Sequence, residues 1–498
     1  MTPKNHPSSH SKELVDIEDA AVGHSAITDP DHQNEADTAW AVDPANPRNW
    51  SSSKKWRMAG VISYYAFISP VATSLIAPAL GAIAEGYHIT NPTVLALTLS
   101  VYLLGFTLGP LILAPLSEFY GRTWVLHIAN IIAFVFTIAC AVAPSTGSLI
   151  AFRFLGGLGG AAALSVGSGS IADLWDEKDR GGAMGLFVLG PVVGPAIGPV
   201  AGGFIAQNLD YHWVFWVLAI LVGAGSIVGI PTLRETYAPV IRARKAKAEG
   251  RTLPNDDATP KDQSLFRMLS AHLTRPFVIL TTDIICLNLS LYAAVIYGTL
   301  YMMLVTLSDV YTNDYGWSTG IAGLAYIGPG IGFILGTVFF VKAGEVVSAK
   351  LTERNGGTRQ PEYRIPVMLV GSLIMPVGLL WYGWSADQHA HWILPIIGGG
   401  FFGAGMMICF LAIQVYLVDS FIYAASAAAA ATTLRSLFGF SFPLFADKTF
   451  TTLGIGGGYS LIAGLSVILG WPFPIYIYLR GEKLRARSKH TISTQRKG

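Results

Sequence analysis

The segment GPVVGPAIGPVAGG, residues 190–203, is uncharged and decides the fold class of this chain. Its glycines recur at every fourth position, at Gly190, Gly194, Gly198 and Gly202, and Gly203 follows the last of them. A proline follows three of these glycines, at Pro191, Pro195 and Pro199. At about 3.6 residues per turn the glycines lie on one helix face, where another helix can approach backbone to backbone. Each proline removes an amide donor, which a helix tolerates where its neighbours satisfy the freed carbonyl group. The segment therefore predicts a closely packed, bent helix in a membrane bundle.

The composition of the whole chain indicates the same setting. Of 498 residues, 52% are hydrophobic and only 13% are charged, and the mean hydropathy is +0.48. A soluble domain carries about 25% charged residues, so a polytopic membrane protein is predicted. The three cysteines, Cys140, Cys286 and Cys409, lie in apolar runs, which predicts neither a disulfide framework nor a metal site.

Apolar stretches long enough to cross about 30 Å of hydrocarbon fall into two groups. The first group lies near residues 58–83, 93–116, 124–143, 148–172, 182–206 and 213–232. The second group lies near residues 276–304, 319–341, 365–385, 391–417, 425–446 and 457–479. The predicted fold is an all-α polytopic membrane protein with twelve transmembrane helices in two pseudo-symmetric halves of six.

The loops between these spans alternate in charge. Basic residues collect on one side, most densely in the central loop, so the positive-inside rule places both termini in the cytoplasm. The predicted organisation is a disordered cytoplasmic tail at 1–54, a first half at 55–232, a cytoplasmic central loop at 233–275, a second half at 276–480 and a basic cytoplasmic tail at 481–498. The N-terminal tail is either a regulatory segment or a solvated leader, and both alternatives stay open.

The loop after the second span reads GPLILAPLSEFYGRTW, residues 109–124. Its turn holds Glu118, Gly121 and Arg122. The acid is placed to cap a helix N-terminus, and the base is placed to pair with a carboxylate of a neighbouring helix. Such a latch holds one state of a gate and breaks in the other, so the three residues are predicted to form a cytoplasmic gate.

This loop resembles the signature loop of the major facilitator superfamily, and PLSEFYGR resembles the form found in its fungal twelve-span drug:proton antiporter branch. The loop departs from the general signature at Ala114, Phe119 and Thr123. Further stretches resemble this branch in order along the chain: FRFLGGLGGA (152–161), IADLWDEKDRGGAM (171–184), LRETYAPVIRARKAKA (233–248), PEYRIP (361–366), AIQVYLVDS (412–420) and AASAAAAATTLRSLFGFSFPLF (424–445). The opening segment 190–203 is similar to the antiporter motif of the fifth span. Further gate partners are expected at the cytoplasmic helix ends, at Asp173, Arg180 and Asp419.

Arg153 and Arg435 are the basic residues placed well inside predicted spans. A charge there costs at least about 2.5–3.5 kcal/mol on insertion scales, so each should face a polar cavity or find partners. Each arginine either takes part in the coupling of substrate and proton movement or ties helices together through backbone carbonyl groups. No Asp or Glu lies near the middle of spans one, two, four or five. Asp283, about two helical turns into the seventh span, is the predicted proton carrier, and the alternative is an acid that starts a helix.

Polar and aromatic residues inside the spans define a candidate cavity: Tyr64, Asn288, Tyr292, Tyr297 and Gln414. Asn288, Tyr292 and Tyr297 recur at near-helical spacing and are expected to share one face. Aromatic walls with few fixed charges suit amphiphilic organic molecules. Each tyrosine has the alternative role of an interfacial anchor or a core filler.

The predicted function is secondary active export of drugs, toxins or a secondary metabolite in exchange for protons, by alternating access. No nucleotide-binding fingerprint occurs in a suitable context, which argues against direct coupling to ATP. The resemblance to drug:proton antiporters implies the proton gradient as the energy source, and neither a cofactor nor a metal is expected. The expected partners are the lipid bilayer, a small-molecule substrate and protons, with no nucleic acid. The chain is expected to act as a monomer in the plasma membrane, with the vacuolar membrane as the alternative. An importer of the same fold, a sensor and a membrane enzyme are the competing functions.

Overall fold

The computed structural model describes residues 40–176, 178–250 and 265–492. The expectations for residues 1–39 and 493–498 lie outside this part of the chain. Helices dominate it, and its one isolated β-bridge joins Phe421 to Thr491. Eleven helical stretches of the described chain are long and apolar enough to cross a membrane.

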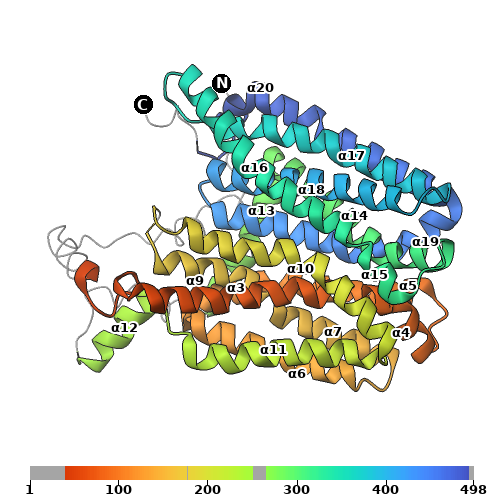
Figure 1. Ribbon diagram of the computed structural model, residues 1–498. Helices are drawn as coiled ribbons and strands as arrows, with labels where there is room; N and C mark the ends of the chain where they lie inside the picture. The colour runs from red at the N-terminus through yellow and green to blue at the C-terminus, as the bar shows by residue number, and fades with distance from the viewer. Residues whose placement is uncertain (1–39, 177, 251–264, 493–498) are drawn as a thin grey trace, which may run out of the picture.

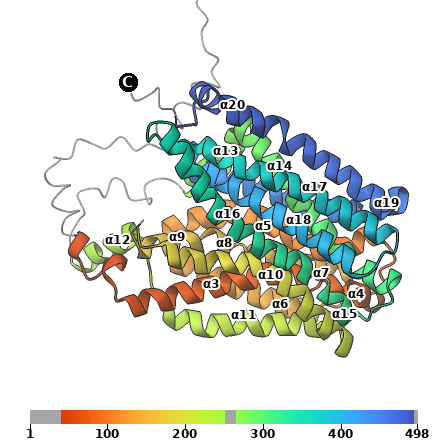
Figure 2. The same ribbon diagram turned by 45° about the horizontal axis from the view of Figure 1, so that its top comes forward.

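The helices form two groups that lie side by side in both views (Figures 1 and 2). The first group comprises α3 (Ser52–Ser74), α4 (Leu80–Gly86), α5 (Pro92–Tyr120), α6 (Arg122–Ala141), α7 (Thr146–Gly160), α8 (Ala162–Ser165), α9 (Gly167–Leu174), α10 (Gly181–Asn208) and α11 (His212–Thr232). The second comprises α13 (Leu265–Thr282), α14 (Ile284–Asp309), α15 (Thr319–Leu324), α16 (Ile327–Arg354), α17 (Ile365–Asp387), α18 (Ile393–Ser420), α19 (Ala424–Gly470) and α20 (Pro472–Arg487). The short α12 (Ala238–Ala248) connects them in sequence.

The longest helix, α19, contains one membrane crossing and the first part of the next, which α20 completes. Within α19, Gly454 has φ 72° and ψ 169°, which is not helical. Glycine adopts positive φ without the steric cost of a Cβ, so the chain breaks the helix there. The eleven apolar stretches therefore hold twelve crossings, and the predicted all-α fold is confirmed.

The two membrane sides differ in charge and in how the halves meet. We call the side that carries α12, Arg122 and Arg364 the basic side, and the other the opposite side. Among the described residues three side-chain hydrogen bonds join the halves, and all lie toward the opposite side. They run from Tyr301 Oη to Thr73 Oγ1 (2.8 Å), from Thr93 Oγ1 to the Leu444 carbonyl (3.2 Å), and from the Gly320 amide to Gln207 Oε1 (2.8 Å). The halves are thus tied together on the opposite side.

Three predicted boundaries differ from the structure. Residues 40–50, assigned to the tail, contact α12, where Asp43 pairs with Lys245. The seventh span starts as α13, inside the predicted central loop, and Asp283 separates it from α14. At the other end, α20 continues past the predicted limit of the second half. Hydropathy locates the apolar part of each helix, whereas caps and partners set where the helix ends.

Candidate functional site

The glycine face of α10 packs directly on α3. A Cβ on Gly190 would lie 2.7 Å from the Phe67 amide nitrogen, and one on Gly194 would lie 3.1 Å from the Phe67 carbonyl oxygen. A Cβ on Gly202 would overlap the Leu75 carbonyl oxygen. Glycine is therefore required along this face, because the two backbones leave no room for a side chain.

The end of α10 reaches the second half of the protein. A Cβ on Gly203 would lie 2.8 Å from the Thr319 carbonyl oxygen, at the start of α15. Across the contact, a Cβ on Gly323 would lie 2.9 Å from the Pro199 carbonyl oxygen. Helix α10 thus packs against α3 of its own half and against α15 of the other half.

An ion pair lies on the basic side of the first half. Arg122 Nε donates to Asp173 Oδ2 at 2.8 Å, and its Nη1 donates to Ser117 Oγ at 3.2 Å. The hydroxyl of Thr236 donates to the same carboxylate oxygen at 3.2 Å. The structure therefore brings together two predicted gate residues, Arg122 and Asp173, and links them to the segment that follows α11.

The helix cap at this gate comes from Glu235. Its carboxylate accepts the amide hydrogens of Arg122 (2.9 Å) and Thr123 (3.3 Å), the first residues of α6. Gly121 has φ 101°, and a Cβ there would collide with the Glu235 carboxylate. The capping role predicted for Glu118 is wrong, since no hydrogen bond of the Glu118 side chain occurs within the described chain. Glu235 was missed because it lies 113 residues from its partner, although it belongs to the quoted stretch 233–248.

Glu118 lies instead near the Tyr237 ring. Burial, together with the charge of Glu118, raises the pKa of the Tyr237 phenol above its ordinary value. The Arg122 guanidinium lies over the same ring, 5.0 Å from its centroid. Tyr237 is thus a common neighbour of the predicted gate acid and of Arg122.

The other predicted gate residues lie on the basic side as well. Arg180 occupies the N-cap position of α10. Asp419 lies near the end of α18, where its charge is attracted by Arg364 at the start of α17. This arrangement parallels Asp173 at the end of α9 and Arg122 at the start of α6, so the two halves repeat the same charge placement.

A second ion pair lies on the basic side of the second half, and the sequence analysis missed it. Arg485 Nε donates to Glu362 Oε1 at 2.8 Å and Nη2 donates to Glu362 Oε2 at 2.9 Å. The side chains are 4% and 5% exposed. Arg485 Nη1 also donates to the Ile492 carbonyl at 2.8 Å, and Thr491 Oγ1 donates to the Arg485 carbonyl. Thr491 and Ile492, which were predicted to belong to the cytoplasmic tail, therefore contact the C-terminal part of α20. The quoted PEYRIP stretch contained Glu362, but no signal in sequence pointed to Arg485.

Arg153 of α7 is buried among backbone carbonyl groups. Its Nη1 donates to the Ala72 carbonyl of α3 at 2.8 Å, and Nε and Nη2 donate to the Thr98 and Leu99 carbonyls of α5 at 3.2 and 3.4 Å. The Tyr102 ring covers the cation, with its centroid 4.6 Å away. These contacts match the structural tie, which was one of the two alternatives. A role in coupling would require these bonds to break in another state.

Arg435 of α19 lies between two aromatic rings. Its guanidinium carbon is 4.8 Å from the ring centroids of Tyr297 on α14 and Phe410 on α18. Arg435 Nε is buried and has no hydrogen-bond partner among the described residues, and the same is true of Asn288 Oδ1 and Thr433 Oγ1. A buried polar atom without a partner costs about 1–3 kcal/mol. These atoms on the packed pair α14 and α19 are therefore suited to receive a bound molecule or water.

The other predicted cavity residues divide into two groups. Tyr64 donates its hydroxyl to the Leu221 carbonyl at 3.1 Å within the first half, and Tyr292 is fully buried beside Cys409. Both are core fillers in this structure. Asn288 and Tyr297 are about 2.5 turns apart on the continuous helix α14 and so lie on opposite faces of it, which makes the predicted shared face of Asn288, Tyr292 and Tyr297 wrong. Gln414 is half-buried and lies one turn from Phe410, on the side of Arg435.

Asp283 caps a helix. Its Oδ1 accepts the amide hydrogens of Ile285 and Cys286, both at 2.9 Å, and the residue is 3% exposed. This geometry fits the alternative of a helix-start acid. The proton-carrier role stays a prediction.

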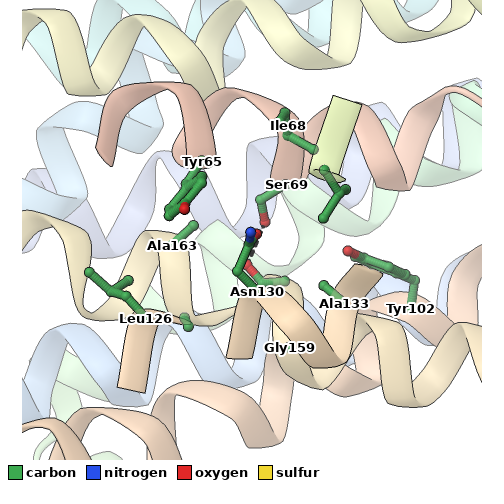
Figure 3. Close-up of a pocket in the computed structure, with 12 residues that line it drawn as sticks. Tyr65, Ile68, Ser69, Tyr102, Leu126, Asn130, Ala133, Gly159 and Ala163 are labelled. Carbon is green, nitrogen blue, oxygen red and sulfur yellow. Dashed lines mark hydrogen bonds between the residues drawn. The ribbon is translucent and has the colours of Figure 1, made fainter. Parts of the chain in front are cut away.

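A small cavity lies inside the first half (Figure 3). Tyr65, Ser69 and Asn130 line it, and its volume is about 20 Å³. That space admits about one water molecule, whereas pockets for drug-sized ligands have volumes of about 300–1,000 Å³. The cavity is therefore not a site for an organic substrate.

This chain is similar in sequence to known proteins over most of its length. Residues 62–443 match the family model described as Major Facilitator Superfamily. The chain is 42% identical to the MFS transporter cpaT of Aspergillus oryzae over 91% of this chain and 92% of that one. It is 40% identical to the efflux pump radE of Floropilus chiversii (90% and 84% covered) and 39% identical to the efflux pump vrtL of Penicillium aethiopicum (98% and 98% covered).

Solved structures share the fold at low sequence identity. The xylose transporter XylE from E. coli, in a partially occluded inward-open conformation, aligns with a TM-score of 0.64 at 17% identity, covering 86% of this chain and 98% of that one. A bacterial homologue of the human lysosomal transporter Spinster aligns with a TM-score of 0.57 at 18% identity, covering 88% and 94%. At these identities the likeness shows the fold alone.

Proposed function

This chain belongs to the major facilitator superfamily, and from that premise we propose that it exports small amphiphilic organic compounds in exchange for protons. The observation that carries the export direction is the similarity, at 39–40% identity over most of the chain, to relatives named efflux pumps. The proposed cargo is a drug, a toxin or a secondary metabolite. The protein acts as a monomer in the lipid bilayer and needs no cofactor beyond the proton gradient.

The basic side is the cytoplasmic side in this proposal. Cytoplasmic loops carry an excess of Lys and Arg, and α12 alone contributes Arg242, Arg244, Lys245 and Lys247. Both termini then lie in the cytoplasm. The plasma membrane is the proposed location, and a vacuolar membrane would keep the same loops in the cytosol.

Alternating access follows from where the halves are joined. Hydrogen bonds between the halves lie on the opposite side, which supports entry of the substrate from the basic side. For release, these bonds break and the basic-side ends approach. The pair Arg122–Asp173, with its cap Glu235, is the latch that holds or releases the first half during this change.

The substrate site lies around Arg435. Tyr297 and Phe410 supply aromatic walls, and Arg435 Nε offers a donor without a partner in the described chain. An amphiphilic molecule satisfies this mixture, because its apolar part contacts the aromatic rings while an acceptor group pairs with Arg435 Nε.

A proton gradient supplies sufficient energy for export. One proton that moves down about 100 mV and about one pH unit yields roughly 3.7 kcal/mol, enough for a substrate gradient of roughly several hundredfold. Asp283 is the proposed carrier of that proton.

Proteoliposomes with an imposed pH gradient test the proposal against a panel of labelled amphiphilic compounds. We expect at least one compound to be moved only when the gradient is present. Movement that is indifferent to the gradient would refute proton coupling. In cells, accumulation that rises on expression would make the protein an importer, and a phenotype that survives Arg153→Ala without transport would favour a sensor.

A further inference from the structure

A groove on the outer surface of the first half runs along α5 and α6. Its volume is about 510 Å³, and apolar or aromatic side chains line it, apart from Arg244 of α12. Trp124 and Ile128 on its α6 wall are 58% and 53% exposed. Both helices are membrane spans, so these exposed side chains face lipid. The groove is therefore placed to hold hydrocarbon.

The groove extends from the basic side toward the middle of the membrane. Its α6 wall runs from Trp124 to Ile132, which at about 1.5 Å per residue spans roughly 12 Å. Tyr120 and Trp124 lie at the basic end of this length, where aromatic side chains favour the headgroup level. The length and direction match an acyl chain whose headgroup lies at the basic side.

Arg244 closes the headgroup end of the groove. Its Nη2 donates to the Tyr120 carbonyl at 3.3 Å, which positions the guanidinium, and no acidic side chain of the described chain pairs with it. Arg242 and Lys245 on the same helix are engaged by Trp40 and Asp43. Arg244 is thus the cation of α12 that points to the groove.

We propose that this groove binds an anionic phospholipid of the basic-side leaflet. One acyl chain lies between α5 and α6, and the lipid phosphate pairs with Arg244, whose planar donors fit phosphate oxygens. Lys247 is exposed and lies three residues further along α12, so it shares this face and adds a second positive charge. Zwitterionic lipids lack the net charge that these two cations favour.

The site adjoins the gate turn. Arg244 bonds to Tyr120, and the next two residues are Gly121 and Arg122, which the Glu235 carboxylate holds. A bound lipid therefore stabilises the contact between α12 and the end of α5, which lies beside the Arg122–Asp173 pair.

Native mass spectrometry of the full-length protein tests the proposal with phosphatidylserine and phosphatidylcholine as probes. We expect phosphatidylserine to be preferred by about fivefold. Arg244→Gln should abolish the preference and Arg244→Lys should keep most of it. Arg354→Gln, which removes an exposed cation from the basic end of α16, is the matched control and should change nothing.

Two further measurements distinguish the contribution of the acyl chain from that of the headgroup. Leu116→Trp narrows the groove and should lower retention of phosphatidylserine, whereas glycerophosphoserine without acyl chains should fail to bind. Equal binding of both lipids, an unchanged preference in Arg244→Gln, or strong binding of glycerophosphoserine would each overturn the proposal. Arg244 is exposed, so its variants are expected to fold, and unchanged thermal unfolding without added lipid checks this.

Discussion

Arg485 neutralises Glu362 inside the protein from a position 123 residues further along the chain. Gly481 allows this approach, because a Cβ there would collide with the Glu362 carboxylate. The pair joins the turn Pro361–Arg364, directly before α17, to α20, and the bridge between Phe421 and Thr491 adds the end of α18 to the same clamp. The clamp thus holds helices of the second half together on the basic side. On that side no hydrogen bond joins the two halves within the described chain.

Arg485→Ala is expected to destabilise the protein strongly, because it leaves the Glu362 carboxylate buried without a partner. The expected cost is about 3–5 kcal/mol, measured as a lower midpoint of thermal unfolding in detergent. Lys483→Ala, an exposed change two residues earlier, should leave the midpoint unchanged. The double variant Glu362→Met/Arg485→Met removes both charges and should recover most of the loss. Wild-type stability in Arg485→Ala would contradict the clamp.

Gly202→Ala should abolish transport although the protein still reaches the membrane. The added methyl group overlaps the Leu75 carbonyl, and overpacking of this kind costs about 1–3 kcal/mol and forces α10 away from α3. Gly185→Ala in the same helix is the control, since a Cβ there meets nothing within 4 Å. Transport assays on membranes with matched protein levels compare the two. Equal transport activity of the two variants would show that the glycine face serves helix packing and is not needed for transport.

Glu235→Ala should weaken the N-terminus of α6, because the amides of Arg122 and Thr123 lose their acceptor. Loss of such a cap costs about 0.5–2 kcal/mol, which lowers the midpoint of thermal unfolding. The matched variant Glu118→Ala removes a neighbouring acid that caps nothing, so its midpoint should stay at the wild-type value. Identical shifts for both variants would assign the effect to net charge.

Arg435→Gln is expected to weaken substrate binding with little change in stability. A hydrogen bond to a charged group contributes about 1.5–3 kcal/mol, so KM for an exported compound should rise about tenfold or more. No carboxylate of the described residues pairs with Arg435, so the variant leaves no buried acid without a partner and thermal unfolding should be nearly unchanged. Arg480→Gln on α20 provides a control at an exposed cation. An unaltered KM would remove Arg435 from the site.

Asp283→Asn separates the two roles of this residue. Asparagine caps helices about as well as aspartate, so folding should be retained, but the amide cannot carry a proton. Transport driven by a pH gradient should therefore be lost in Asp283→Asn. Asp283→Ala should in addition cost about 1 kcal/mol, because the cap is also removed. A pH profile equal to that of the wild type in the Asn variant would leave Asp283 as a cap alone.

Hydropathy and glycine spacing could predict the fold, because each span and the contact face of α10 are encoded locally. The pairing of Arg122 with a carboxylate could also be predicted, since a cation in a tight turn needs a partner. Glu235 and Arg485 could not be found, because their partners lie more than a hundred residues away. The burial of Tyr292 could not be predicted from the sequence either. A helix that is apolar on all sides has no periodicity to show which face meets a cavity.

The late position of Arg485 has a consequence for biosynthesis. Glu362 is translated and positioned with its helices while 123 residues still separate it from the cation that neutralises it. Throughout that interval the nascent chain carries an uncompensated acid at a membrane boundary. Quality-control machinery that recognises unpaired charge would therefore retain or degrade chains that stop before Arg485, so delivery of the protein to its membrane depends on the last helix, α20.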